Sequence, residues 1–153
     1  MAGGRVLPDV MAAMISMLRA DPDVSALCLQ NVPSGGTPRI GVSFPETEDP
    51  AKQWKLPNYV LLVRRAGGPA ANLEVGMRYA RLDVVCYGPG NTIGTRRRTA
   101  DQLWRTVDPV LCPPNGVPSS FRFANTEMMW IYPEAEPIPS MEPGTDWARA
   151  TDT

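Results

Sequence analysis

The sequence predicts an α/β fold in which an antiparallel or mixed sheet of about four strands carries two main helices on one face. Three observations predict it: an amphipathic helix pattern near the N-terminus, two neighbouring strand patterns joined through a Gly-rich connection, and a second amphipathic helix directly after them. With 153 residues, the chain has the length of one domain. We expect residues 1–132 to form this domain, and residues 133–153 to form a proline-rich extended tail or a late edge strand.

The first helix is predicted over "LPDVMAAMISMLRA", residues 7–20. Pro8 suits the first helical position, and Asp9 complements the positive end of the helix dipole. In the next segment, "DPDV", Asp21 can cap and Pro22 can begin a second short helix. The apolar stripe of the first helix contains Leu7, Val10, Met11, Met14, Ile15 and Leu18, and that of the second contains Val24, Leu27 and Cys28.

Two loops and a short strand are predicted before the main strands. The stretch "QNVPSGGTP" reads as a loop, and "RIGVSF" is a short strand candidate. The segment 45–57, "PETEDPAKQWKLP", is polar and contains three prolines and an exposed Trp54. We expect it to be a loop arm that docks on a neighbouring molecule.

Two strong strand patterns follow, over residues 59–65 and 78–87. Because they are close in sequence and joined through glycines, they should pair antiparallel. In the second strand, Ala80, Leu82, Val84 and Cys86 should face the helices, whereas Tyr79, Arg81, Asp83 and Val85 should face the other way. Arg64 or Arg65 of the first strand should lie near Asp83, and this charged face needs either a subunit neighbour or a ring lumen.

The glycines after the second strand raise the question of a phosphate site. Gly88, Gly90 and Gly94 give G-x-G-x-x-x-G, which is one residue longer than the dinucleotide fingerprint. Pro89 lacks an N–H that could face a phosphate, and the expected antiparallel pairing does not suit a parallel βαβ unit. These features favour a sharp bend over a nucleotide site.

The second main helix is predicted over "TRRRTADQLWRTVDPVL", with Asn91 or Thr92 as cap and Pro109 near its end. Its apolar face contains Ala100, Leu103, Trp104, Val107 and Leu111, of which Leu103 and Trp104 should pack against Leu82 and Val84. A last strand is predicted over residues 121–132, with Met128, Trp130 and Tyr132 on one side.

Three consecutive arginines, Arg96, Arg97 and Arg98, open this helix. They fan out over roughly 200° and cannot all face one ligand. A solvated face, a subunit or partner interface and a nucleic-acid contact are the open alternatives, and arginine is enriched in interfaces.

Composition argues against several classes of function. The chain contains no histidine, the commonest general base and metal ligand, so we expect no catalytic site, no metal and no cofactor. Its three cysteines are scattered, and its net charge of −1 offers no global attraction to nucleic acid. No run of 18 apolar residues exists, and "VMAAMISML" is better explained as a helix than as a signal peptide.

The order of these elements resembles the tail terminator proteins of long-tailed bacteriophages and the related small head–tail joining proteins. The most telling piece is "YARLDVVCYGPGNTIGTRRRTADQLWRTVDPVL", in which a strand with charged residues ends in Tyr-Gly and a short turn leads into a helix. The resemblance covers roughly residues 7–132.

The resemblance implies a structural virion protein of the tail–neck region, assembled in the host cytoplasm. Such proteins form a hexameric ring that caps the head-proximal end of the tail tube and joins it to the head connector, while DNA passes through the lumen without specific binding. The alternatives are another neck component, such as a stopper or head-completion protein, or a small enzyme that uses Cys86 or Cys112. The expected interface residues are Trp54, Arg64, Arg65, Tyr79, Arg81, Asp83, Arg96, Arg97 and Arg98.

Overall fold

The structure is a computed structural model that describes residues 10–32, 34–43, 58–65 and 82–113, together with four short strands between residues 121 and 152. Three helices are present in this part of the chain: α1 (Val10–Ala20), α2 (Pro22–Cys28) and α3 (Ile93–Leu111). The strands are β1 (Ile40–Gly41), β2 (Val60–Arg65), β3 (Leu82–Tyr87), β4 (Phe121–Phe123), β5 (Thr126–Met128), β6 (Ile138–Met141) and β7 (Ala148–Asp152).

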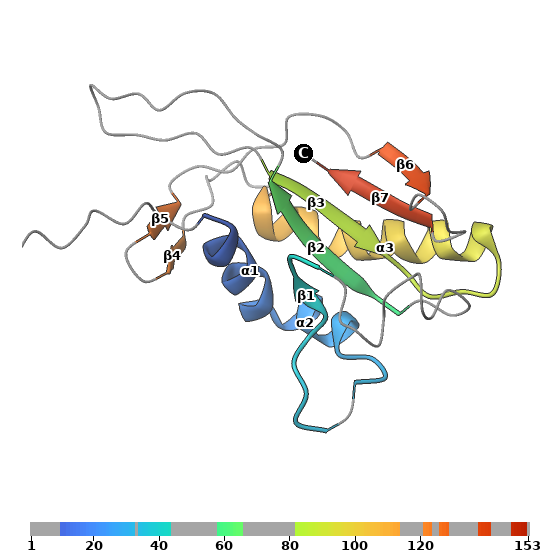
Figure 1. Cartoon of the computed structure of the whole chain (residues 1–153), viewed down its shortest axis with the longest axis horizontal. Coiled ribbons are helices and arrows are strands. Elements are labelled where there is room, and N and C mark those ends of the chain that lie inside the picture. Colours follow the sequence, from blue (N-terminus) through green and yellow to red (C-terminus); the bar gives the residue numbers. More distant parts are fainter. Residues whose placement is uncertain are drawn as a thin grey trace, which may run out of the picture.

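The main sheet is mixed and has the strand order β1–β2–β3–β7–β6 (Figure 1). Strand β1 runs parallel to β2, and the other neighbouring pairs are antiparallel. The predicted α/β class and the antiparallel pairing of β2 with β3 are therefore confirmed. The sheet has five strands in this order, whereas the sequence predicts about four.

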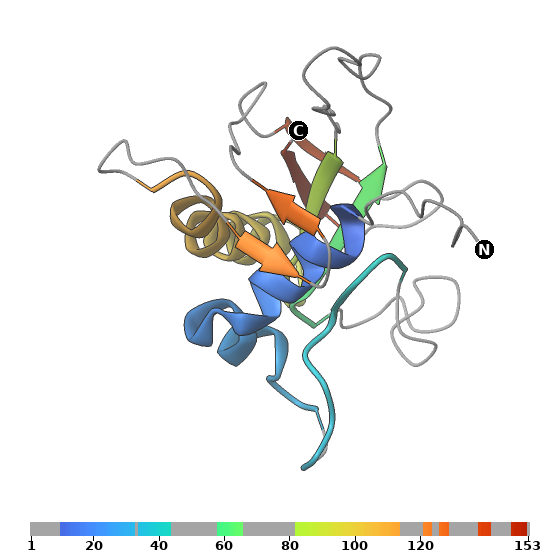
Figure 2. The same ribbon diagram turned by 90° about the vertical axis from the view of Figure 1, so that its left-hand side faces the viewer.

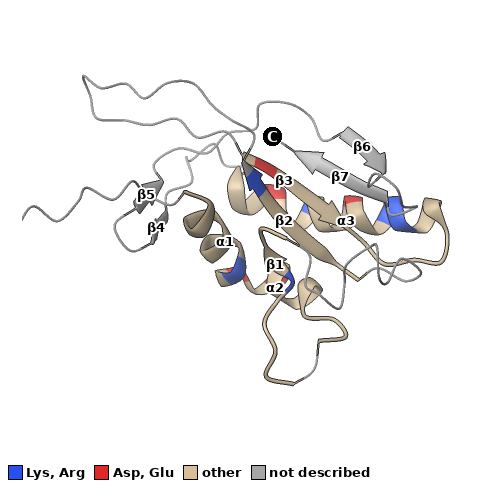
Figure 3. Cartoon of the chain, in the orientation of Figure 1, with Lys and Arg blue, Asp and Glu red and all other residues tan. Residues whose placement is uncertain are grey.

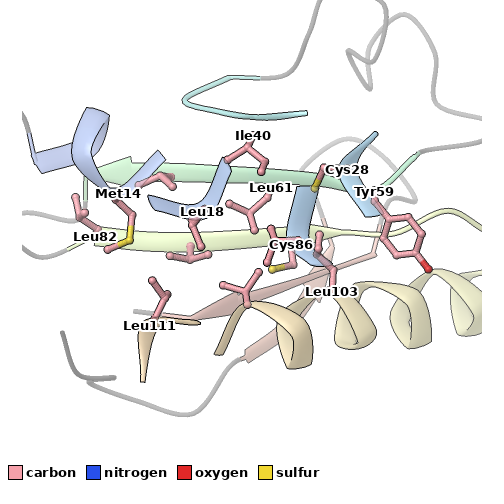
Figure 4. Packing of buried hydrophobic residues seen from close by; sticks show 14 of the residues in the cluster. Met14, Leu18, Cys28, Ile40, Tyr59, Leu61, Leu82, Cys86, Leu103 and Leu111 are labelled. Carbon is pink, nitrogen blue, oxygen red and sulfur yellow. The ribbon is translucent and has the colours of Figure 1, made fainter. Parts of the chain in front are cut away.

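All three helices contribute to one core on the same face of the sheet (Figure 4). Leu61 and Val63 of β2 and Val84 and Cys86 of β3 face it, as the strand alternation predicts. The buried helical members of this core are Ala13, Met14 and Leu18 of α1, Val24 and Cys28 of α2, and Leu103, Val107 and Leu111 of α3. The expected apolar stripes are thus confirmed, with Trp104 packed at the margin of the core instead of inside it.

The opposite face of β2 and β3 is also buried within the single chain. Val60, Leu62, Val85 and Tyr87 form a second cluster in which no side chain is more than 2% exposed. The sequence predicts that the face carrying Val85 needs a neighbouring subunit or a ring lumen, and for Val85 this prediction is wrong. The apolar residues of this face are therefore already covered within one chain and do not need a neighbouring subunit.

The predicted strand over residues 121–132 is divided in the structure. β4 and β5 pair with each other antiparallel, with Phe123 opposite Thr126, and they form a sheet of their own. This hairpin lies beside α1 (Figure 2). Because β4 and β5 run antiparallel, they cannot be parts of one continuous strand.

Two strands of the C-terminal segment 133–153, β6 and β7, take part in the main sheet. β7 lies between β3 and β6, and α3 packs against both β3 and β7. The expectation of a separate extended tail is therefore wrong for these strands, whereas the alternative of a late edge strand fits β6. The loop arm expected over residues 45–57 lies outside the described residues.

Two arginines bind backbone carbonyls at the β1 edge of the sheet. Arg19 of α1 donates from Nε (3.1 Å) and Nη2 (2.6 Å) to the carbonyl of Ile40, while the carbonyl of Arg39 accepts from the N–H of Leu61 in β2. An unpaired strand edge is open to pairing with another chain, and Arg19 occupies one carbonyl of the β1 edge. Arg39 is only 8% exposed and donates from Nη1 to the carbonyl of Gln30 at 2.5 Å, just after α2 ends.

Candidate interaction surface on helix α3

The turn between β3 and α3 lies directly against the helix that it introduces. A Cβ added to Gly88 would lie 2.5 Å from the backbone nitrogen of Ala100 and 2.1 Å from Oγ1 of Thr99. A Cβ on Gly90 would lie 2.8 Å from Cγ2 of Thr95. Glycine is therefore required at positions 88 and 90 because the turn packs too closely on α3 to leave room for a side chain.

Side chains of α3 bind the carbonyls of this turn. Thr99 Oγ1 donates to the carbonyl of Pro89 at 2.7 Å, and Nε of Arg96 donates to the carbonyl of Gly90 at 3.0 Å. The helix begins with Thr92 as its cap, whose Oγ1 accepts from the N–H of Thr95 at 3.1 Å. This arrangement supports the interpretation of the glycine motif as a packed bend.

The three consecutive arginines at the start of α3 differ in the burial of their side chains. Arg96 is 4% exposed and buried under the turn, whereas Arg97 and Arg98 are exposed. The 100° step of a helix is the physical reason, because only one of three consecutive side chains can point toward the turn. Burial of Arg96 contradicts its expected place in an interface.

We expect Arg96→Ala to destabilise the protein by about 1.5–3 kcal/mol, because a charged hydrogen bond to the Gly90 carbonyl is lost and that carbonyl loses a donor. Arg97→Ala is the matched control and should change stability by less than about 0.5 kcal/mol. Urea titration followed by circular dichroism would measure both. Equal midpoints for the two variants would contradict the assigned role of Arg96.

The outward side of α3 is basic along its N-terminal half (Figure 3). Ile93 is 41% exposed, and nothing lies within 4 Å of a Cβ built on Gly94, so the surface is open here. Helical spacing places five exposed positions on one side of α3: 93, 94, 97, 98 and 105. We call the set Ile93, Gly94, Arg97, Arg98 and Arg105 the basic face of α3.

One carboxylate lies within this basic face. Asp101 pairs with Arg105 at 2.9 Å, with side chains 47% and 74% exposed respectively. An exposed pair of this kind contributes at most about 1 kcal/mol. Arg97 and Arg98 lie in the second turn of α3, beyond the first turn in which the helix dipole acts most strongly. Their positive charge is therefore not explained by the stability of α3.

The remaining expected interface residues are only partly described. Arg64 and Asp83 are cross-strand partners in β2 and β3, as predicted, and both are partly buried at the end of the second apolar cluster. The side chain of Arg65, together with Trp54, Tyr79 and Arg81, lies outside the described residues.

The three cysteines are free thiols that differ in their exposure to solvent. Cys28 and Cys86 are fully buried, and Cys112 at the end of α3 is partly exposed. Burial raises the pKa of the Cys28 thiol to about 12, and nearby Arg39 opposes this shift. Because the thiolate is the nucleophile, Cys28 is unreactive at neutral pH.

A thiol reagent added to the folded protein should react with Cys112 first. Cys28 and Cys86 should react only as fast as the protein unfolds, because the reagent cannot reach them in the core. Cys112→Ser should remove the fast phase, and denatured wild-type protein should show three reactive thiols. A fast phase that survives Cys112→Ser would show that a buried thiol is activated and would favour the enzyme alternative.

Within the part of the chain that the structure describes, no group of three or more potential metal-ligating side chains lies together. No helix among these residues is long and apolar enough to span a bilayer. Comparison of the sequence with models of protein families, with curated proteins and with solved structures finds no match.

Proposed function

We propose that this protein is a structural subunit of a bacteriophage neck, of the tail-terminator kind. In this role six copies form a closed ring that ends the tail tube and meets the head connector. The ring would belong to the tail–neck region of the virion, and it would be assembled in the host cytoplasm. DNA would pass through its lumen without specific binding.

The observation that carries the proposal is the basic face of α3 on a nearly neutral chain. The net charge is −1, and Arg97 and Arg98 are exposed on this face. A basic face can contact a different, acidic site on the next copy, head to tail, as a closed heterologous ring requires. The basic face also rests on a rigid support, since α3 is anchored in the core through Leu103 and Val107.

The order of elements supports the same proposal. Helices α1 and α2, the β2–β3 hairpin and helix α3 follow one another as in the stretch that resembles tail terminators. The burial of Cys86 works against the enzyme alternative that would use it as a nucleophile.

The mass of the assembly tests the proposal. Light scattering on purified protein should show a particle of about 100 kDa, since six copies of a 16.7 kDa chain give this mass. Electron microscopy of the protein mixed with tail tubes should show rings at one end of the tubes. A protein that stays monomeric with and without tubes would overturn the proposal, and rings that bind only the head connector would identify a stopper or head-completion protein instead.

A further inference from the structure

We infer that the basic face of α3 binds the acidic segment Glu46–Asp49 of a neighbouring copy of this chain. This inference rests on the proposed ring and names the contact that would hold it together. Three steps lead to it: the charge of the face, its accessibility and the position of carboxylates in the sequence.

The first step concerns the unbalanced charge of the face. Arg97 and Arg98 lie in the second turn of α3, and the first turn of α3 contains no acidic residue. The neighbouring Asp101 already pairs with Arg105. A carboxylate partner from another molecule would balance the charge of Arg97 and Arg98.

The second step concerns access. Arg97, Arg98, Ile93 and Gly94 are exposed in the single chain, so a partner segment can reach them without any rearrangement of the core. Ile93 offers apolar contact beside the two charges, and the absence of a side chain at Gly94 lets a partner backbone approach closely.

The third step concerns the occupant. The segment "ETED", residues 46–49, holds Glu46, Glu48 and Asp49, the densest run of carboxylates in the sequence. Three carboxylates facing two arginines give complementary charge, and prolines at positions 45 and 50 restrict the segment and reduce the entropy lost on binding. A contact between one site on one copy and a different site on the next is the heterologous kind that closes a ring.

Charge reversal and its compensation test this contact. Arg97→Glu combined with Arg98→Glu should raise the protein concentration at which half of the rings dissociate by at least about tenfold. Glu46→Lys combined with Glu48→Lys should do the same, and the protein that carries all four changes should regain most of the ring. Because both arginines are exposed, the thermal midpoint of the Arg97→Glu, Arg98→Glu variant should stay close to that of the wild type.

Glu134→Lys combined with Glu136→Lys is the matched control, since it reverses two other carboxylates in a proline-rich segment, and it should leave the ring intact. Rings that survive reversal of Arg97 and Arg98, or a four-residue variant that fails to reassemble, would overturn the inference while the ring proposal stands. A wild-type chain that forms no ring, even with tail tubes, would overturn the proposed function itself.

Discussion

Gly88→Ala is expected to destabilise the protein by about 3 kcal/mol or more, the upper end of the cost of overpacking. The added methyl group would lie 2.5 Å from both the nitrogen of Ala100 and the carbonyl carbon of Thr99. These are backbone atoms of α3, which cannot rotate away as a flexible side chain can. The helix would have to move away from β3, and this movement would loosen the core on that side of the sheet.

Gly94→Ala provides the matched control in the same segment. Nothing lies within 4 Å of a Cβ at Gly94, which is the second residue of α3. Alanine there should leave stability unchanged or raise it by up to about 1 kcal/mol, because glycine costs more backbone entropy in a helix. Guanidinium titrations of both variants would decide the matter: similar midpoints would contradict the close approach of the turn to α3.

Leu103→Ala is expected to cost about 2–5 kcal/mol in unfolding free energy, because the side chain is fully buried and its loss leaves a cavity. Leu103 lies at the centre of the core between α3 and the helix-facing side of β3. Calorimetry would show a lower melting temperature, and Arg105→Ala, on the exposed side of the same helix, should shift it little.

Trp104→Ala should cost less than the roughly 3–5 kcal/mol that removal of a fully buried tryptophan costs. The sequence predicts that Trp104 packs in the core against Leu82 and Val84, but the structure places this side chain at the margin of the core, only partly buried. We expect a loss of about 1–3 kcal/mol, in proportion to the smaller area removed from water. A loss greater than that of Leu103→Ala would contradict this ranking.

The helices and the β2–β3 hairpin could be predicted from the sequence because their signals are local. The 3.6-residue period of α3, the alternation along β3 and the caps Asp21 and Thr92 each depend on residues within a few positions of one another. The antiparallel pairing of the two strands follows from their neighbouring positions in the chain, whereas the sequence left open whether Arg64 or Arg65 would lie near Asp83, and the structure places Arg64 opposite it.

The candidate site was predicted only in part, since sequence cannot distinguish among consecutive arginines. Arg96, Arg97 and Arg98 have the same side chain, but only Arg96 lies under the turn. The turn that begins at Gly88 lies close against α3, and this contact decides which arginine is buried. In the sequence, the glycine itself was the one signal of this close contact.

By itself the sequence determined the α/β class, the helix-facing side of β3 and the bend at the glycines. Only the tertiary structure decided that Val85 is buried on the opposite face, that β4 and β5 pair as two separate strands, and that β7 pairs with β3. The physical reason is that short strands carry little periodicity, and their pairing depends on partners far away in the chain. Burial of a polar or charged side chain such as Arg96 likewise depends on which carbonyls the fold brings within reach, and no local pattern encodes that proximity.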